Sequence, residues 1–194
     1  DVEDGVAILT LNRPDKLNSL NVPVFEALDA HVKAIAADPS GVAVVVLRGA
    51  GGHFCSGAYL KDMAAARMRA MQGGEDGIDP IAEVNAQFGR MCAAFASSPL
   101  AIVAVLEGTV MGGGFGLACV ADVAIASETA SFRLPETSLG VVPAQIAPFL
   151  VERLGYSQAK RLAVTGGRLD AVAALQIGLV HQQVATDQLQ TAID

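Results

Sequence analysis

Two glycine-containing segments could present backbone N–H groups to a negatively charged oxygen. The first covers residues 53–58 (HFCSGA) and the second is Gly112–Gly114, and each lies between a predicted strand and a predicted helix. A helix N-terminus adds positive partial charge, and glycine lets another group approach the backbone closely. Two such donors, fixed before reaction, could stabilise an oxyanion without a formal positive charge. The alternative is that these glycines only permit tight turns or helix packing.

Glu136 is the leading acid/base candidate. It follows Pro135 in a predicted loop between apolar segments. Burial beside apolar neighbours would raise the pKa of its carboxyl group toward a range that suits proton transfer. The alternative is a carboxylate at a helix N-terminus or on the surface.

Two other reactive side chains lie in the first glycine segment. We expect His53 to be a packed loop histidine near the entrance of the site rather than a general base. Cys55 has no accompanying His/Asn pattern, so we expect a small buried hydrophobe rather than a nucleophile.

These residues require a framework of alternating strands and helices, which predicts an α/β fold with its loops gathered at one end. The continuous, β-branched run at 42–47 predicts a strand buried on both faces. Asn21 is a plausible N-cap, with Pro23 in the first turn of the helix that follows. The acidic, glycine-rich stretch at 73–80 predicts a mobile lid. The other expected strands are 6–11, 102–106, 122–126 and 180–184, and the expected helices are 21–37, 60–69, 81–96, 113–120, 147–154, 157–164 with Ser157 as N-cap, and 170–177.

Composition disfavours several function classes. Thirteen basic against twenty acidic residues give a net charge of −7, so nucleic acid is not an expected partner. The longest apolar runs are far shorter than the roughly 20 residues that span a bilayer, so we expect no membrane partner. Three scattered cysteines suit free thiols in a reducing cytoplasm, and three histidines without ligand spacing predict no metal site.

Four motifs occur together along nearly the whole chain: NRPDKLN at 12–18, FCSGAYLK at 54–61, the glycine-rich stretch at 108–117, and the segment 135–143. In order and spacing they resemble the enoyl-CoA hydratase/isomerase (crotonase) family. That resemblance implies a spiral of ββα turns closed by C-terminal helices, with residues 1–194 forming a single domain. Family members run some tens of residues further, so part of the C-terminal helical region is expected to be missing.

The resemblance also implies the chemistry of the site. It implies an acyl-CoA thioester substrate, no redox or metal cofactor, and a homotrimer or dimer of trimers. By position, Ala58 and Gly113 match the family's oxyanion donors, and Glu136 matches one of its two catalytic glutamates. Further residues expected to contact substrate are Lys16, Leu17, Ser56, Tyr59, Leu60, Lys61, Gly112, Gly116 and Gln145.

Several of these substrate residues have open alternatives. Tyr59 stands where many members carry aspartate, and it could lie against adenine in the CoA channel or simply be packed. Lys16 and Lys61 could bind CoA phosphates or remain solvated.

Gly116 departs from the family pattern, because it stands at the position of the second hydratase glutamate. The leading hypothesis remains a lyase that adds water to a 2-enoyl-CoA. The alternatives are a Δ3,Δ2-enoyl-CoA isomerase that uses Glu136 alone, and a catalytically silent CoA-binding homologue.

The segment 133–154, especially 142–149 (VPAQIAPF), resembles the isohexenylglutaconyl-CoA hydratase branch of the family. This likeness makes a branched, glutaconyl-like acyl group a candidate. Gln145 in this segment could orient water or bind substrate, or it could cap the helix that begins near Ala147.

Overall fold

The computed structural model describes residues 2–39, 41–59, 64–65, 68 and 80–193. Most of the predicted helix at 60–69 and nearly all of the predicted lid at 73–80 lie outside these residues. The α/β fold expected from the sequence is confirmed.

The larger sheet has six strands in the order β1-β2-β3-β4-β6-β9. Its first pair is antiparallel and all the others are parallel. The strands are β1 Val2–Glu3, β2 Val6–Leu11, β3 Val44–Gly49, β4 Ala101–Leu106, β6 Val123–Ser127 and β9 Gln182–Val184. A smaller sheet has the order β5-β7-β8, with β5 Thr109–Met111, β7 Ser131–Arg133 and β8 Arg168–Asp170.

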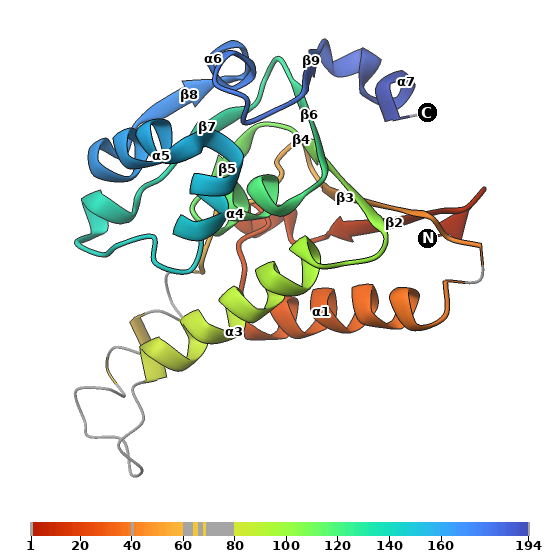
Figure 1. Ribbon diagram of the computed structural model, residues 1–194, viewed down its shortest axis with the longest axis horizontal. Coiled ribbons are helices and arrows are strands. Elements are labelled where there is room, and N and C mark those ends of the chain that lie inside the picture. Colours follow the sequence, from red (N-terminus) through yellow and green to blue (C-terminus); the bar gives the residue numbers. More distant parts are fainter. Residues whose placement is uncertain (1, 40, 60–63, 66–67, 69–79, 194) are drawn as a thin grey trace.

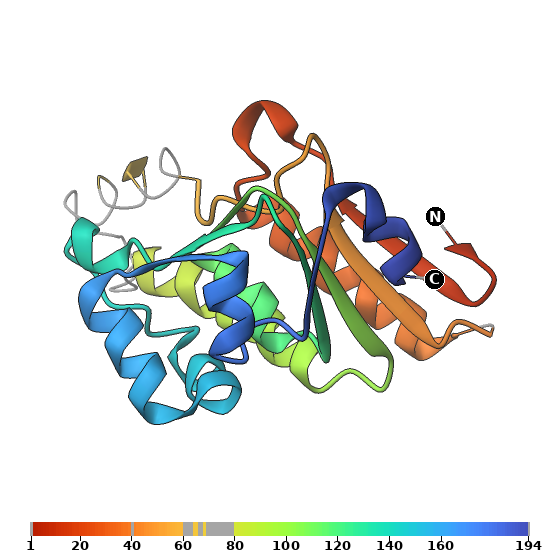
Figure 2. The same ribbon diagram turned by 90° about the horizontal axis from the view of Figure 1, so that it is seen from above.

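Helices pack on both sides of the larger sheet. The α-helices are α1 Val22–Ala37, α3 Pro80–Ala96, α4 Gly113–Val120, α5 Ala147–Thr165, α6 Ala171–Gln176 and α7 Leu189–Ile193, and the 3-10 helices are η1 Pro14–Lys16, η2 Glu136–Leu139 and η3 Thr186–Gln188. Figure 1 shows α1 and α3 side by side on one side of the sheet and α7 on the other. Figure 2 shows α5 at one end of the molecule and the β1–β2 hairpin at the other.

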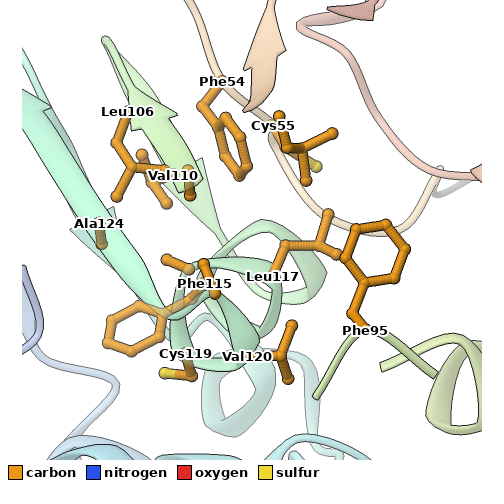
Figure 3. Packing of buried hydrophobic residues seen from close by; sticks show 14 of the residues in the cluster. Phe54, Cys55, Phe95, Leu106, Val110, Phe115, Leu117, Cys119, Val120 and Ala124 are labelled. Atoms are coloured by element: carbon orange, nitrogen blue, oxygen red, sulfur yellow. The ribbon is translucent and has the colours of Figure 1, made fainter. Parts of the chain in front are cut away.

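The central strand β3 is buried on both faces, as its unbroken apolar run predicts. Val45 and Leu47 belong to the main core, whereas Val46 belongs to a small cluster on the opposite face with Leu189 of α7. Helix α4 lies inside the main core, and Figure 3 shows its Phe115 and Leu117 among the neighbouring buried side chains. Gly113, the first residue of α4, therefore lies on a helix that the packing of the core holds in place.

The predicted N-cap of α1 is confirmed, because the Asn21 side chain accepts a hydrogen bond from the Val24 amide. The predicted pair of helices at 147–154 and 157–164 is confirmed, since α5 consists of two helical segments that meet at a kink. The kink residue is Gly155, whose φ of 70° is non-helical, so Ser157 is not an N-cap. None of the described helices is both long enough and apolar enough to cross a membrane.

Candidate functional site

The first glycine segment is held against β5 by backbone hydrogen bonds. Cys55 forms a parallel bridge with Val110, because its amide donates to Thr109 O (2.9 Å) and its carbonyl accepts from the Met111 amide (2.9 Å). β5 leads directly to Gly112 and α4. This pairing brings the two glycine segments predicted from the sequence to the same place.

Gly57 and Gly113 lie close together where the two segments meet. A Cβ atom on Gly57 would lie 2.8 Å from Met111 O and 3.3 Å from Gly113 N, and the φ of Gly57 is +86°. Both facts require glycine at position 57. Within the described part of the chain, neither the Ala58 amide nor the Gly113 amide donates a hydrogen bond. Two N–H groups without a partner among these residues therefore lie close together, the second at the N-terminus of α4.

Asn18 supports this arrangement from behind. Its side-chain amide donates to Ala50 O (2.9 Å) and His53 O (2.6 Å), and its Oδ1 accepts from the Arg13 amide (2.8 Å). Asn18 is buried. Its backbone adopts the left-handed conformation, with a φ of 53°. In the sequence Asn18 is marked only as the last residue of the NRPDKLN motif, although an asparagine in a turn is typical of this geometry.

Leu20 continues the same support. Its amide donates to Gly57 O (2.8 Å), and its carbonyl accepts from the Tyr59 amide (2.8 Å). The Ala58 peptide is thus held between two hydrogen bonds to the residue-20 backbone.

Glu136 is the first residue of η2 and lies beside Gly112. A Cβ atom on Gly112 would be 3.2 Å from Glu136 Oε1. The other carboxylate oxygen, Oε2, is buried and has no hydrogen-bond partner among the residues that the structure describes. Burial raises the pKa of Glu136, and a hydrogen bond to its own backbone amide opposes this only in part. The Glu136 carboxyl group, whose pKa is raised, thus lies beside Gly112, the residue that precedes Gly113.

Gly116 adjoins apolar side chains. A Cβ atom there would overlap Ile146 Cγ2, lie 3.2 Å from Ile146 Cβ and lie 3.6 Å from Phe88 Cζ. A Cβ atom on Gly113 would likewise meet Phe88 and Leu20, at 3.2 and 3.1 Å. The space where a residue-116 carboxylate would project is occupied by hydrocarbon. Ile146 lies in the segment 142–149 that the sequence singles out, whereas Phe88 and Leu20 carry no such signal, because they are distant along the chain from Gly113 and Gly116.

Gln145 lies against helix α3. A Cβ atom on Gly89 would overlap Gln145 Oε1 and lie 3.1 Å from Gln145 Cδ. The N-cap of α5 is Ile146, so the capping alternative for Gln145 is wrong.

Four other predicted substrate residues, Lys16, Leu17, Ser56 and Tyr59, lie in or near the NRPDKLN turn, with Lys16 and Leu17 exposed. Lys16 Nζ is 3.1 Å from Asp15, the Ser56 amide donates to Leu17 O (3.0 Å), and Ser56 Oγ donates to Lys16 O (3.4 Å). The Tyr59 ring lies 5.2 Å from the Arg13 guanidinium, which occupies one of its faces. Leu60 and Lys61 lie outside the described residues.

His53 and Cys55 have structural partners. His53 Nδ1 accepts a hydrogen bond from the Thr109 amide (3.1 Å), which agrees with a packed loop histidine. Burial raises the pKa of the Cys55 thiol to about 12, so it is a small buried hydrophobe as expected. No group of three or more His, Cys, Asp or Glu side chains among the described residues could hold a metal ion.

Comparison with known proteins identifies the family to which the chain belongs. The family described as enoyl-CoA hydratase/isomerase matches residues 1–193. A Rhizobium meliloti protein named "Probable enoyl-CoA hydratase" is 36% identical over 190 residues, which are 97% of this chain and 69% of that protein. The chain thus spans about two thirds of the length of this relative.

Two solved structures superpose on the whole chain. An enoyl-CoA hydratase/isomerase from Marinobacter aquaeolei is 44% identical with a TM-score of 0.92, and Pseudomonas aeruginosa AtuE is 46% identical with a TM-score of 0.93. Each alignment covers 100% of this chain and 72% of the solved one. The fold is therefore crotonase-like, and the chain belongs to the enoyl-CoA hydratase/isomerase (crotonase) family.

Proposed function

We propose that this protein adds water to a 2-enoyl-CoA, with the thioester oxygen held between the Ala58 and Gly113 amides. The observation that carries the proposal is the Glu136 carboxylate, whose Oε1 lies beside Gly112 and whose buried Oε2 has no hydrogen-bond partner among the described residues. Buried polar atoms without partners are rare in native structures and call for an explanation such as catalysis. Relatives named enoyl-CoA hydratase support the reaction class.

The proposed reaction uses Glu136 twice. Its carboxylate takes a proton from water while the water oxygen bonds to the β-carbon, and the electrons of the C=C bond move onto the thioester oxygen as an enolate. The protonated Glu136 then donates that proton to the α-carbon, which restores the carbonyl. Its raised pKa suits both steps. The two free amides stabilise the enolate, and one such donor is typically worth about 10² to 10³ in rate.

A Δ3,Δ2-enoyl-CoA isomerase is the second candidate, and the apolar surroundings of Gly116 favour it. Ile146 and Phe88 adjoin the Gly116 Cα, where a second carboxylate would project to share the handling of water. In this reaction Glu136 removes a proton from C2 of a 3-enoyl-CoA and returns it to C4. No water is consumed.

Product masses separate the two candidates. The full-length protein is incubated with crotonyl-CoA, a 3-enoyl-CoA and a branched glutaconyl-CoA, the last because of the local likeness at 133–154. Addition of water increases the product mass, whereas isomerisation leaves it unchanged. Binding without turnover of any of the three would instead favour a catalytically silent CoA-binding protein. Full activity of Glu136→Gln would exclude both enzymatic candidates.

A further inference from the structure

The segment 136–146 begins and ends on the same face of helix α4. Gly112 is the N-cap of α4, and Gly116 lies four residues later, which is about one helical turn. Glu136 Oε1 lies beside the Gly112 Cα, and the Ile146 side chain lies beside the Gly116 Cα. Two glycines one turn apart therefore receive the two ends of this segment, which we call the carboxylate loop.

The Ile146 end of the carboxylate loop has little freedom to move. Ile146 is buried, and as a β-branched residue it has a restricted χ1 angle. It is the N-cap of α5, and its amide donates to Pro143 O (3.2 Å). Displacing its Cβ and Cγ2 atoms therefore requires a shift of the backbone.

Gln145 provides a natural comparison at the preceding position. Its side chain lies against Gly89 of α3 as closely as Ile146 lies against Gly116. The atom that a Cβ on Gly89 would meet first is the terminal Oε1 of a flexible, partly exposed side chain. This end can swing away without moving the backbone.

The Glu136 carboxylate has few ties of its own. Oε2 accepts no hydrogen bond from the described residues, so no described side chain orients the carboxylate through that oxygen. The backbone is held instead, because Glu136 O accepts from the Val141 amide (3.0 Å) and Thr137 Oγ1 donates to Ala163 O (2.6 Å). The position of the carboxylate therefore follows the position of the loop backbone.

We propose that Ile146 is a positioning residue for Glu136. Its side chain, lodged beside Gly116, fixes the carboxylate loop on α4 and so sets the carboxylate beside the Gly113 amide. This inference rests on the proposed role of Glu136 in proton transfer. It also explains why residue 116 is glycine: a side chain there would push the loop outward.

The variant Gly116→Ala in the full-length protein tests the proposal. Its turnover is measured on the enoyl-CoA that the parent protein converts. The added Cβ displaces Ile146, so kcat falls about 10²-fold, as expected for a misplacement of about 1 Å. KM changes by less than about threefold, because the oxyanion donors are untouched. Gly116→Ala combined with Ile146→Ala recovers kcat at least about tenfold, since the overlap is removed. The matched control Gly89→Ala stays within about twofold, because Gln145 can swing away.

Three results would overturn the proposal: a folded Gly116→Ala variant with parental kcat, a double variant no more active than Gly116→Ala, or an equal loss in Gly89→Ala. If Gly116→Ala does not fold, Ile146→Ala and Ile146→Val decide. A loss of about tenfold or more in kcat for alanine, but not for valine, supports positioning. Equal kcat in both overturns it. Activity retained by Glu136→Gln would instead overturn the proposed function, and that result is separate from these.

Discussion

The two halves of the candidate site are held in different ways. The donor half, around Ala58 and Gly113, is fixed by backbone hydrogen bonds to Leu20 and to β5. The acid/base half, Glu136, has a carboxylate oxygen with no hydrogen-bond partner, and its loop ends on α4 through apolar packing. The donor amides, which must stay fixed, are thus held in place by directional hydrogen bonds. The group that must take up and release a proton has one carboxylate oxygen without such a bond to the described residues, and it is held mainly through its loop.

Removing the carboxylate should have the largest effect on turnover. Glu136→Gln keeps the shape of the side chain but cannot accept a proton, so kcat should fall about 10³-fold, within the usual range for general acid–base catalysis. Steady-state kinetics on the responsive enoyl-CoA measures the loss. Glu128→Gln, at an exposed carboxylate, is the matched control and should leave kcat unchanged.

Disturbing the donor half should have the next largest effect. Gly57→Ala adds a Cβ atom 2.8 Å from Met111 O at a φ of +86°, which should displace the Ala58 amide and lower kcat about 10²-fold. Gly52→Ala has similar backbone strain, with a φ of +72°, but no atom within 4 Å of the added Cβ. If both variants lose kcat equally, backbone strain rather than the donor position would explain the loss.

The support behind the donor half should appear in stability. Asn18→Ala leaves the Ala50 and His53 carbonyls without their side-chain donor and places alanine in the left-handed conformation. We expect the free energy of unfolding to fall by about 2–3 kcal/mol, as measured by urea denaturation. Asn12→Ala, at an exposed position in the same turn, should change stability little. Similar values for the two variants would contradict the support that we assign to Asn18.

The smallest effect should be a pH dependence of stability from Glu136. Because burial raises its pKa, the folded state binds the proton more tightly than the unfolded state does. Its contribution to stability is therefore complete below the unfolded pKa and is lost as pH rises through the raised folded pKa. The free energy of unfolding is measured by denaturation at a series of pH values from acid to neutral. As pH rises between the unfolded and the folded pKa of Glu136, Glu136→Gln should become more stable relative to the parent. Above the folded pKa this difference should stay constant. A gain toward acid pH would show that the carboxylate is held by favourable bonds instead.

Local sequence patterns predicted five of the six strands of the larger sheet, but not β1 or the order of the strands. The unbroken run in β3 and the cap at Asn21 are local signals, and both predictions hold. The strands β5, β7 and β8 have only three residues each, too few to show a periodicity. The contact between Ile146 and Gly116 joins residues 30 positions apart, and no property of either residue marks it in advance.

Strand β5 gives the site a common reference point. Val110 is paired with Cys55 on one side and with Phe132 on the other. From these three paired residues the chain leads to the site over short intervals. Gly57 comes two residues after Cys55, Gly112 two after Val110, and Glu136 four after Phe132. An insertion or deletion of one residue in any of these intervals would move one component out of step with the other two. During evolution, side chains along these intervals can be exchanged, but their lengths must be kept.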